Sequence, residues 1–214
     1  NATLSRSSYV RKLRRFGIAA KQSEILTSAH GAALYLRQFQ KPRVLPIGEA
    51  GLLAELRAAG IKIVNISEAE KATHVVAALD RKLNYAKIAA AATALFSGAR
   101  FIATNTDATY PTERGLMPGA GATVGAITGC TGRSPEKVIG KPSTFMLELG
   151  LKLTGISKRK AAIIGDRLDT DIVAAKRMGI RSILVLSGVT KRADLRKSDL
   201  RPDFVFNSLQ EVVL

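Results

Sequence analysis

Cysteine, aromatic residues, acidic residues and long apolar runs are all scarce in this sequence of 214 residues. Its one cysteine, Cys130, excludes an internal disulfide and leaves no thiolate cluster for zinc, a pattern typical of a reducing cytoplasm. We interpret Cys130 as a small apolar core residue. The longest apolar run, residues 88–96, is mostly alanine and shorter than a membrane span. We therefore expect a cytoplasmic protein with no membrane partner.

The start of the sequence has no initiator methionine and none of the charged and apolar regions of a signal peptide. We expect the natural N-terminus to lie upstream of Asn1. Hydrophobic residues make up 46% of the chain, which is enough to bury a sizeable core in one large domain or two small ones.

Acidic residues are outnumbered by basic ones, 17 against 33, so the net charge is +16. The excess is +8 in residues 1–43, +2 in residues 44–137 and +6 in residues 138–214. This distribution suggests that the two ends form one body and the middle another. A basic body favours anionic ligands. Nucleic acid is one such ligand, but aromatic residues are only 5% and no RNA-binding or zinc-finger motif is present, so we expect no nucleic-acid partner.

Helical and extended patterns alternate along the chain, as in a parallel sheet covered by helices. We expect helices at residues 7–17, 28–39, 52–59, 85–97 and 144–153, and a further helix after residue 171. We expect strands at residues 43–47, 61–66, 74–79, 101–104, 138–139, 161–164, 182–186 and 204–206. The Gly/Pro-rich segment around residues 117–121 is predicted as a loop. Its glycines lack the preceding strand of a dinucleotide-binding loop, which favours close helix packing instead.

Carboxylates gather after the predicted strand at residues 161–164. Asp166, Asp169 and Asp171 follow the glycine that ends this strand and stand at the start of the next helix. Open α/β sheets bind ligands at this edge, and clustered oxygen ligands suit Mg²⁺. Helix capping explains one of these aspartates but not all three. The spacing therefore predicts a metal site formed by Asp166 and Asp171.

A lysine in a constrained loop forms the second signal. Lys141 stands between Gly140 and Pro142, after a short apolar run and before a predicted helix. Most loop lysines are simply solvated, but a fixed cation beside a metal site is typical of phosphoryl transfer.

The stretches Gly140-Lys141-Pro142-Ser143 and Gly165-Asp166-Arg167-Leu168-Asp169-Thr170-Asp171 together resemble the third and fourth motifs of haloacid dehalogenase phosphatases. Residues 101–107, 111–115 and 186–190 are similar to the NagD-like, p-nitrophenylphosphatase-like group (subfamily IIA), which includes phosphoglycolate phosphatases. The resemblance covers essentially the whole chain. It implies a Rossmann-like α/β core with a parallel sheet and a large α/β cap inserted in mid-chain.

The resemblance also implies a mechanism. In that family an aspartate nucleophile forms an aspartyl-phosphate, a second aspartate acts as acid and base, and Mg²⁺ and a lysine neutralise charge. It makes Lys141 that lysine, Asp166 a metal ligand and Asp171 a supporting carboxylate near the metal. Asn1 matches the last residue of the phosphate-binding second motif. We expect the first motif, with the nucleophile, upstream of Asn1, and the chain is interpreted as N-terminally truncated.

The middle segment, residues 43–136, resembles the cap that selects the substrate, and residues 1–42 with 137–214 resemble the core. Asn105, Asp107 and Tyr110 match the cap loop that faces the phosphate ester. Many family members recognise the ligand from near the position of Tyr110, and some of them use a histidine there. For Asn105 and Asp107, a turn stabilised by their own side chains is an equally good interpretation.

The sequence thus predicts a Mg²⁺-dependent phosphomonoester hydrolase acting on a small phosphorylated metabolite. The alternative is a non-catalytic phosphate-binding protein that keeps the fold without the nucleophile. A nucleic-acid-binding protein would show a steep salt dependence of its affinity for duplex DNA. Homo-oligomerisation through the cap is left open.

Overall fold

The computed structural model describes residues 1–113 and 115–212, apart from the side chain of Pro111. Arg114, part of one of the motifs quoted above, lies outside these residues. The chain divides into two compact units, Asn1–Gly140 and Lys141–Leu214. Each contains its own parallel sheet, so the predicted α/β class is confirmed. Within the described residues, no helix has both the length and the apolar character needed to cross a membrane.

The first unit is built on a five-stranded parallel sheet in the order β2-β1-β3-β4-β7. Its strands are β1 (Arg43–Ile47), β2 (Lys62–Ile63), β3 (His74–Ala77), β4 (Arg100–Ala103) and β7 (Lys137–Val138). Its helices are α1 (Arg6–Arg15), α2 (Ser28–Leu36), α3 (Ala50–Ala58), α4 (Tyr85–Phe96) and α5 (Ala120–Thr131). A two-stranded antiparallel hairpin, β5 (Thr109–Thr112) and β6 (Gly115–Pro118), precedes α5.

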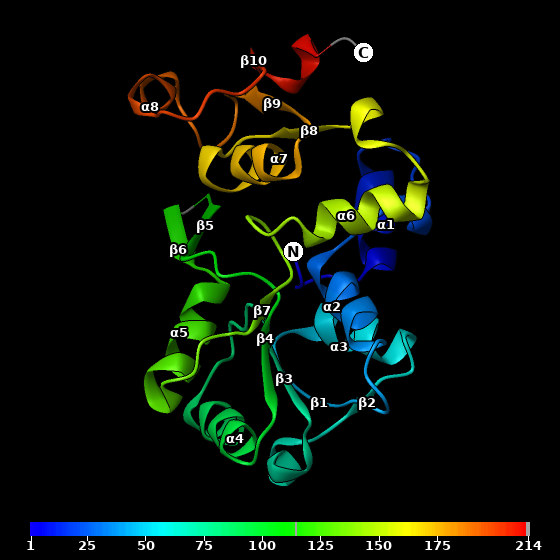
Figure 1. Cartoon of the computed structure of the whole chain (residues 1–214), viewed down its shortest axis with the longest axis vertical. Coiled ribbons are helices and arrows are strands. Elements are labelled where there is room, and N and C mark those ends of the chain that lie inside the picture. Colours follow the sequence, from blue (N-terminus) through cyan, green and yellow to red (C-terminus); the bar gives the residue numbers. More distant parts are fainter. Residues whose placement is uncertain (114, 213–214) are drawn as a thin grey trace. The chain divides into compact units, whose positions relative to one another are not determined.

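Alternate residues of the strands point to opposite faces of this sheet, and helices cover both faces. On one face, Leu45, Val75 and Phe101 belong to a core cluster that includes the alanines of α4 and Ile127 of α5. On the other face, Val76 is also fully buried. Figure 1 shows α4 and α5 on one side of the sheet and α3, with α2 beside it, on the other.

The second unit is built on a three-stranded parallel sheet in the order β10-β9-β8. Its strands are β8 (Ala162–Gly165), β9 (Arg181–Val185) and β10 (Phe204–Phe206), and its helices are α6 (Phe145–Thr154), α7 (Val173–Met178) and α8 (Arg192–Lys197). Leu147 and Leu151 of α6 pack with Met178 of α7 and Ile163 of β8. In the described part of the chain β8 is an edge strand, and its Ile164 is 36% exposed.

Most predicted elements exist, with boundaries shifted by a few residues, but β5, β6, α5 and α8 are missing from the prediction. The segment predicted as a loop around residues 117–121 instead holds strand β6 and the start of α5, and α8 was not expected. Gly119 and Gly121 do allow a close approach, because a Cβ at either would lie within 3 Å of the Asp107 carbonyl oxygen. The contact is between the helix start and a loop rather than between two helices. The prediction of a core Cys130 is wrong, since Cys130 lies exposed on α5.

The compact units do not coincide with the predicted domain boundaries. The strand expected at residues 138–139 in the core sheet is β7, which pairs with β4 of the middle segment. The N-terminal segment is also bound to α3, since the Gly51 amide donates to the Thr3 carbonyl and Arg6 pairs with Glu55. The grouping of residues 1–42 with residues 137–214 therefore stays a prediction.

Candidate active site

The second unit brings Lys141 and Asp171 into direct contact. The Lys141 Nζ donates to Asp171 Oδ1, and the other carboxylate oxygen accepts the backbone N–H of Arg167 at 3.2 Å. Asp171 is 4% exposed at its side chain, whereas Lys141 is 46% exposed. A buried carboxylate thus fixes a lysine whose ammonium group still reaches solvent, which preorganises the charge for an anionic ligand.

Asp171 takes this position because of the turn that carries it. Residues Leu168–Ile172 form a short π-helical turn (η4) between β8 and α7, and such turns often occur at functional sites. Gly165, the last residue of β8, has no side chain, and a Cβ there would lie 2.3 Å from Asp171 Cγ. The glycine therefore lets the Asp171 carboxylate lie against the end of the strand.

Asp166 follows this glycine at the carboxyl end of β8 and is held by the loop after β9. Its Oδ2 accepts the Val189 N–H at 2.8 Å, and its carbonyl accepts the Thr190 N–H at 3.0 Å. Gly188 makes this contact possible, since a Cβ at that position would lie 2.1 Å from Asp166 Oδ2. Gly188 was not among the predicted site residues, although a glycine just after a strand is a signal of close backbone approach.

Asp169 does not join Lys141 and Asp171. Its carboxylate is 65% exposed and receives two hydrogen bonds from Arg167, at 3.0 and 2.6 Å. The hydrogen bonds from Arg167 lower the pKa of Asp169. Of the three clustered aspartates, therefore, Asp166 and Asp171 lie around the end of β8, while Asp169 is turned toward solvent.

The donor set is suited to Mg²⁺ held with few protein ligands. Among residues 1–113 and 115–212 there is no group of three or more Asp, Glu, His or Cys side chains that could enclose a metal. Mg²⁺, however, is commonly held by one or two carboxylates, with water and substrate phosphate completing its octahedron. Asp166 supplies a carboxylate of this kind at the end of β8, and Asp171 lies against Gly165 at the same strand end with both oxygens already accepting hydrogen bonds. The residues present therefore fit such an ion.

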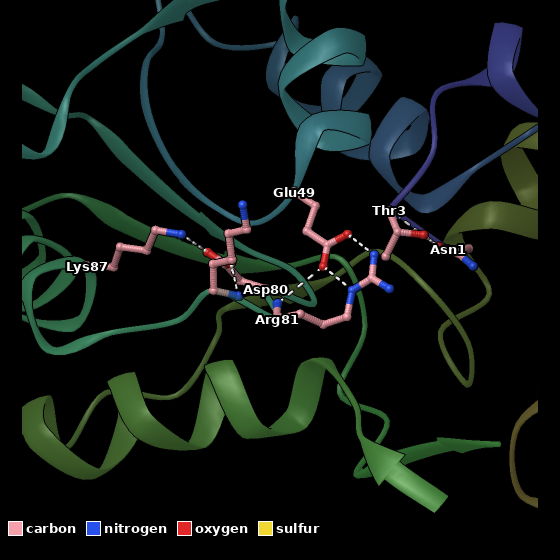
Figure 2. A network of polar contacts seen from close by, with 7 residues as sticks. Asn1, Thr3, Glu49, Asp80, Arg81 and Lys87 are labelled. Carbon is pink, nitrogen blue, oxygen red and sulfur yellow. Dashed lines mark hydrogen bonds and ion pairs between the residues drawn. The ribbon is translucent and has the colours of Figure 1, made fainter. Parts of the chain in front are cut away.

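In the first unit, polar side chains follow the carboxyl ends of β1, β3 and β4. Glu49 comes after β1, and Arg81 comes after β3. Arg81 donates to Glu49 from Nε and Nη2, both at 2.6 Å, and from its backbone N–H at 3.2 Å (Figure 2). The hydrogen bonds lower the pKa of Glu49 and raise that of Arg81, so the pair stays ionised. Beside it, Lys87 Nζ donates to the buried Asp80 at 2.6 Å.

The predicted residues Asn1 and Tyr110 lie beside this pair. Asn1 Oδ1 accepts from the Thr3 N–H at 3.0 Å and from the Thr3 hydroxyl at 2.8 Å. In Figure 2 the guanidinium of Arg81 points toward Thr3 and Asn1. Tyr110, on β5, contributes to the raised pKa of Arg81 through its side chain.

Asn105 and Asp107 form the kind of turn considered for them above. The Asp107 N–H donates to Asn105 Oδ1 at 3.4 Å, and the Asp107 carbonyl accepts the Gly121 N–H at the start of α5 at 2.8 Å. These bonds explain the two residues structurally. Their contact with a substrate stays a prediction. Glu49 and Arg81 were missed, although each follows a parallel strand and the rule that found Asp166 applies to both.

A parallel α/β fold with a fixed lysine and aspartates at the end of a strand defines a phosphoryl-transfer class of site. Family profiles support this class of site. The profile of haloacid dehalogenase-like hydrolases matches residues 1–62, and the profile of HAD-hydrolase-like proteins matches residues 138–212. The chain belongs to the haloacid dehalogenase-like hydrolase family, on its phosphatase branch.

Particular relatives narrow this assignment. The acid sugar phosphatase of Staphylococcus epidermidis is 37% identical over 214 residues, which are 100% of this chain and 81% of that protein. Among solved structures, the p-nitrophenyl phosphatase from Archaeoglobus fulgidus has a TM-score of 0.90 and 39% identity, covering 98% of this chain and 81% of that one. The 4-nitrophenylphosphatase from Thermotoga maritima has a TM-score of 0.92 and 35% identity, covering 99% and 80%.

Proposed function

We propose that the chain carries the charge-neutralising and substrate-selecting parts of a Mg²⁺-dependent phosphomonoester hydrolase that acts on a small phosphorylated metabolite. The observation that carries this proposal is the buried Asp171 carboxylate, which fixes the partly exposed Lys141 ammonium and lies against Gly165, the residue before Asp166. Sugar phosphates are the first substrates to test, because the staphylococcal relative is named an acid sugar phosphatase.

Each residue then has a distinct role. Lys141 neutralises oxygens of the phosphoryl group, and Asp171 holds the lysine in place. Asp166 holds Mg²⁺, which when bound would neutralise further charge on the phosphoryl group. Asn1 donates a hydrogen bond to a phosphoryl oxygen. Following the family resemblance, the ester P–O bond breaks as the phosphoryl group passes to an aspartate carboxylate, and the alcohol leaves with a proton from the second aspartate. Water then attacks the aspartyl-phosphate, which releases phosphate and restores the carboxylate.

We further propose that residues 43–136 act as the substrate-selecting cap and that residues 1–42 and 137–214 form the catalytic core. On this view Tyr110, Asn105 and Asp107 contact the substrate from the cap. Changing Tyr110 to Phe should alter the order of preference among phosphate esters more than it alters the rate with the best of them. A uniform fall across all esters would argue against this role.

The test of the reaction compares Asp166→Ala with Asp169→Ala in the product of the complete gene. The two aspartates lie in the same turn region, but Asp169 is paired with Arg167 and exposed, so it serves as the matched control. We expect Asp166→Ala to abolish Mg²⁺-dependent hydrolysis of p-nitrophenyl phosphate and Asp169→Ala to retain it. Phosphate binding by the wild type without any turnover would favour the non-catalytic alternative.

A further inference from the structure

The Glu49–Arg81 pair combines fixed geometry with exposure. Two hydrogen bonds join the guanidinium to the carboxylate in a planar fork, and a third comes from the Arg81 backbone. Glu49 is 17% exposed at its side chain, whereas Arg81 is 63% exposed. The carboxylate is therefore anchored while much of the Arg81 side chain stays accessible, and the hydrogen bonds fix the guanidinium in an orientation that is preorganised for a ligand.

The location of the pair favours a binding role over a purely structural one. It lies at the carboxyl edge of the five-stranded sheet, where open α/β sheets bind ligands. A second fork of the same kind, Arg100 with Glu136 at 2.7 and 3.3 Å, lies at the opposite, amino edge. Arg100 packs over the ring of Phe39, and this is a structural use of an exposed arginine. The two pairs can thus be compared within one sheet.

The hydrogen-bonding capacity of the pair indicates the chemistry of its ligand. A guanidinium has five N–H groups, and Glu49 takes two of the side-chain donors of Arg81, from Nε and Nη2. Among the described residues, Glu49 Oε2 accepts one hydrogen bond, from Arg81 Nη2, and a carboxylate oxygen can accept another. The pair therefore presents donors and an acceptor side by side. A hydroxyl group, which both donates and accepts, matches this arrangement.

A second anionic group on the ligand matches it less well. The Glu49 carboxylate neutralises Arg81, and the neighbouring Asp80 is neutralised by Lys87. An anion placed at the guanidinium would lie close to the Glu49 carboxylate and be repelled by it. A neutral polyol is not repelled by the Glu49 carboxylate.

The neighbours of the pair link it to the substrate. Tyr110 interacts with Arg81, and the guanidinium points toward Thr3 and Asn1 in Figure 2. In the proposed function, Asn1 donates a hydrogen bond to a phosphoryl oxygen of the substrate. We infer that the Glu49–Arg81 pair is a specificity-determining site that binds hydroxyl groups of a polyol leaving group, as in a sugar phosphate. This inference rests on the proposed function.

The experiment measures kcat/KM on three esters with Mg²⁺ present: glucose phosphate, phosphoglycolate and p-nitrophenyl phosphate. For Arg81→Gln we expect a fall of roughly tenfold with glucose phosphate, the equivalent of about 1.4 kcal/mol, and little change with p-nitrophenyl phosphate. Glu49→Gln leaves the guanidinium charge uncompensated, so it should raise the rate with phosphoglycolate relative to glucose phosphate. Arg100→Gln, the matched control, should leave all ratios unchanged.

Equal losses on all three esters in Arg81→Gln would show that the pair is structural and would overturn the inference. So would an unchanged ratio of glucose phosphate to p-nitrophenyl phosphate. If the wild type hydrolyses no ester, the proposed function fails, and titration calorimetry with glucose phosphate then decides the inference separately. Weaker binding by Arg81→Gln than by Arg100→Gln would support it, and equal binding would reject it.

Discussion

Replacing Gly188 by alanine tests the geometry of the Asp166 site with a single added methyl group. The new Cβ would lie 2.1 Å from Asp166 Oδ2 and 2.4 Å from Asp166 Cβ, distances that real Cβ contacts essentially never show. Asp166 cannot simply turn away, because its Oδ2 accepts the Val189 N–H and its carbonyl accepts the Thr190 N–H. Relieving the overlap requires the carboxylate or the loop to move by about 1 Å or more, since ordinary van der Waals contacts begin at 3.4 Å.

The size of the effect follows from this displacement. Misplacing a catalytic group by about 1 Å can cost on the order of a hundredfold in rate, or about 2.7 kcal/mol in the barrier. Overpacking costs about 1–3 kcal/mol of folding free energy. We therefore expect Gly188→Ala to be folded but to have about a hundredfold lower kcat/KM. It should also need more Mg²⁺ for half-maximal rate, because its metal ligand is displaced.

The assay is hydrolysis of p-nitrophenyl phosphate by the complete gene product over a range of Mg²⁺ concentrations, with thermal unfolding followed by circular dichroism. Gly125→Ala is the control, because nothing lies within 4 Å of a Cβ at that position on α5. That variant should keep wild-type turnover and gain up to about 1 kcal/mol of stability. Wild-type turnover and Mg²⁺ dependence in Gly188→Ala would refute the reasoning about how Asp166 is held.

Three further outcomes are expected. Lys141→Ala should lower kcat by roughly a hundredfold or more, since a preorganised charge is lost, and steady-state kinetics showing a near-wild-type kcat would reject its role. Glu55→Gln should lower the free energy of unfolding in urea by about 2–4 kcal/mol, because the carboxylate is 3% exposed and accepts from the Arg6 N–H at 2.7 Å and Arg6 Nε at 3.0 Å. An unchanged unfolding midpoint would contradict this. Hydrogen bonds from Lys176, the larger cause, and from Ser182 hold the pKa of Asp203 well below its usual range. The ionised Asp203 carboxylate therefore contributes stability above about pH 4, and this contribution is lost as the pH falls toward the lowered pKa. Asp203→Asn should therefore show a shallower loss of stability below about pH 4 in acid titrations followed by circular dichroism, and an identical acid profile would disprove it.

Some features of this protein could be predicted from the sequence because their signals are local. The apolar runs at residues 43–47 and 204–206 form strands with those bounds. Thr27 caps α2, its hydroxyl accepting the His30 N–H. Lys141 and Asp171 could be singled out because each follows an apolar run at a position where a parallel strand must end. Strand length, capping and turn chemistry are decided within a few residues of each other, so one sequence is enough to show them.

Other features depended on tertiary packing. The glycines of α5 have low helix propensity and favoured a loop, yet Val124 and Ile127 are buried against α4 and the sheet, and that packing stabilises the helix. The pairing of β7 with β4 rather than with the second sheet is a choice between distant strands that a short apolar run cannot indicate.

The Glu49–Arg81 pair shows the same limit at the level of the site. The two residues are 32 positions apart, and they meet because β1 and β3 are adjacent and parallel, which brings their carboxyl ends to one edge of the sheet. The same holds for Gly188 and Asp166, whose strands β9 and β8 are adjacent. The sequence by itself determined which residue types follow each strand. Only the order of the strands in the folded sheets decided which of those residues meet, because side-chain contacts across a sheet depend on strand pairing and not on separation along the chain.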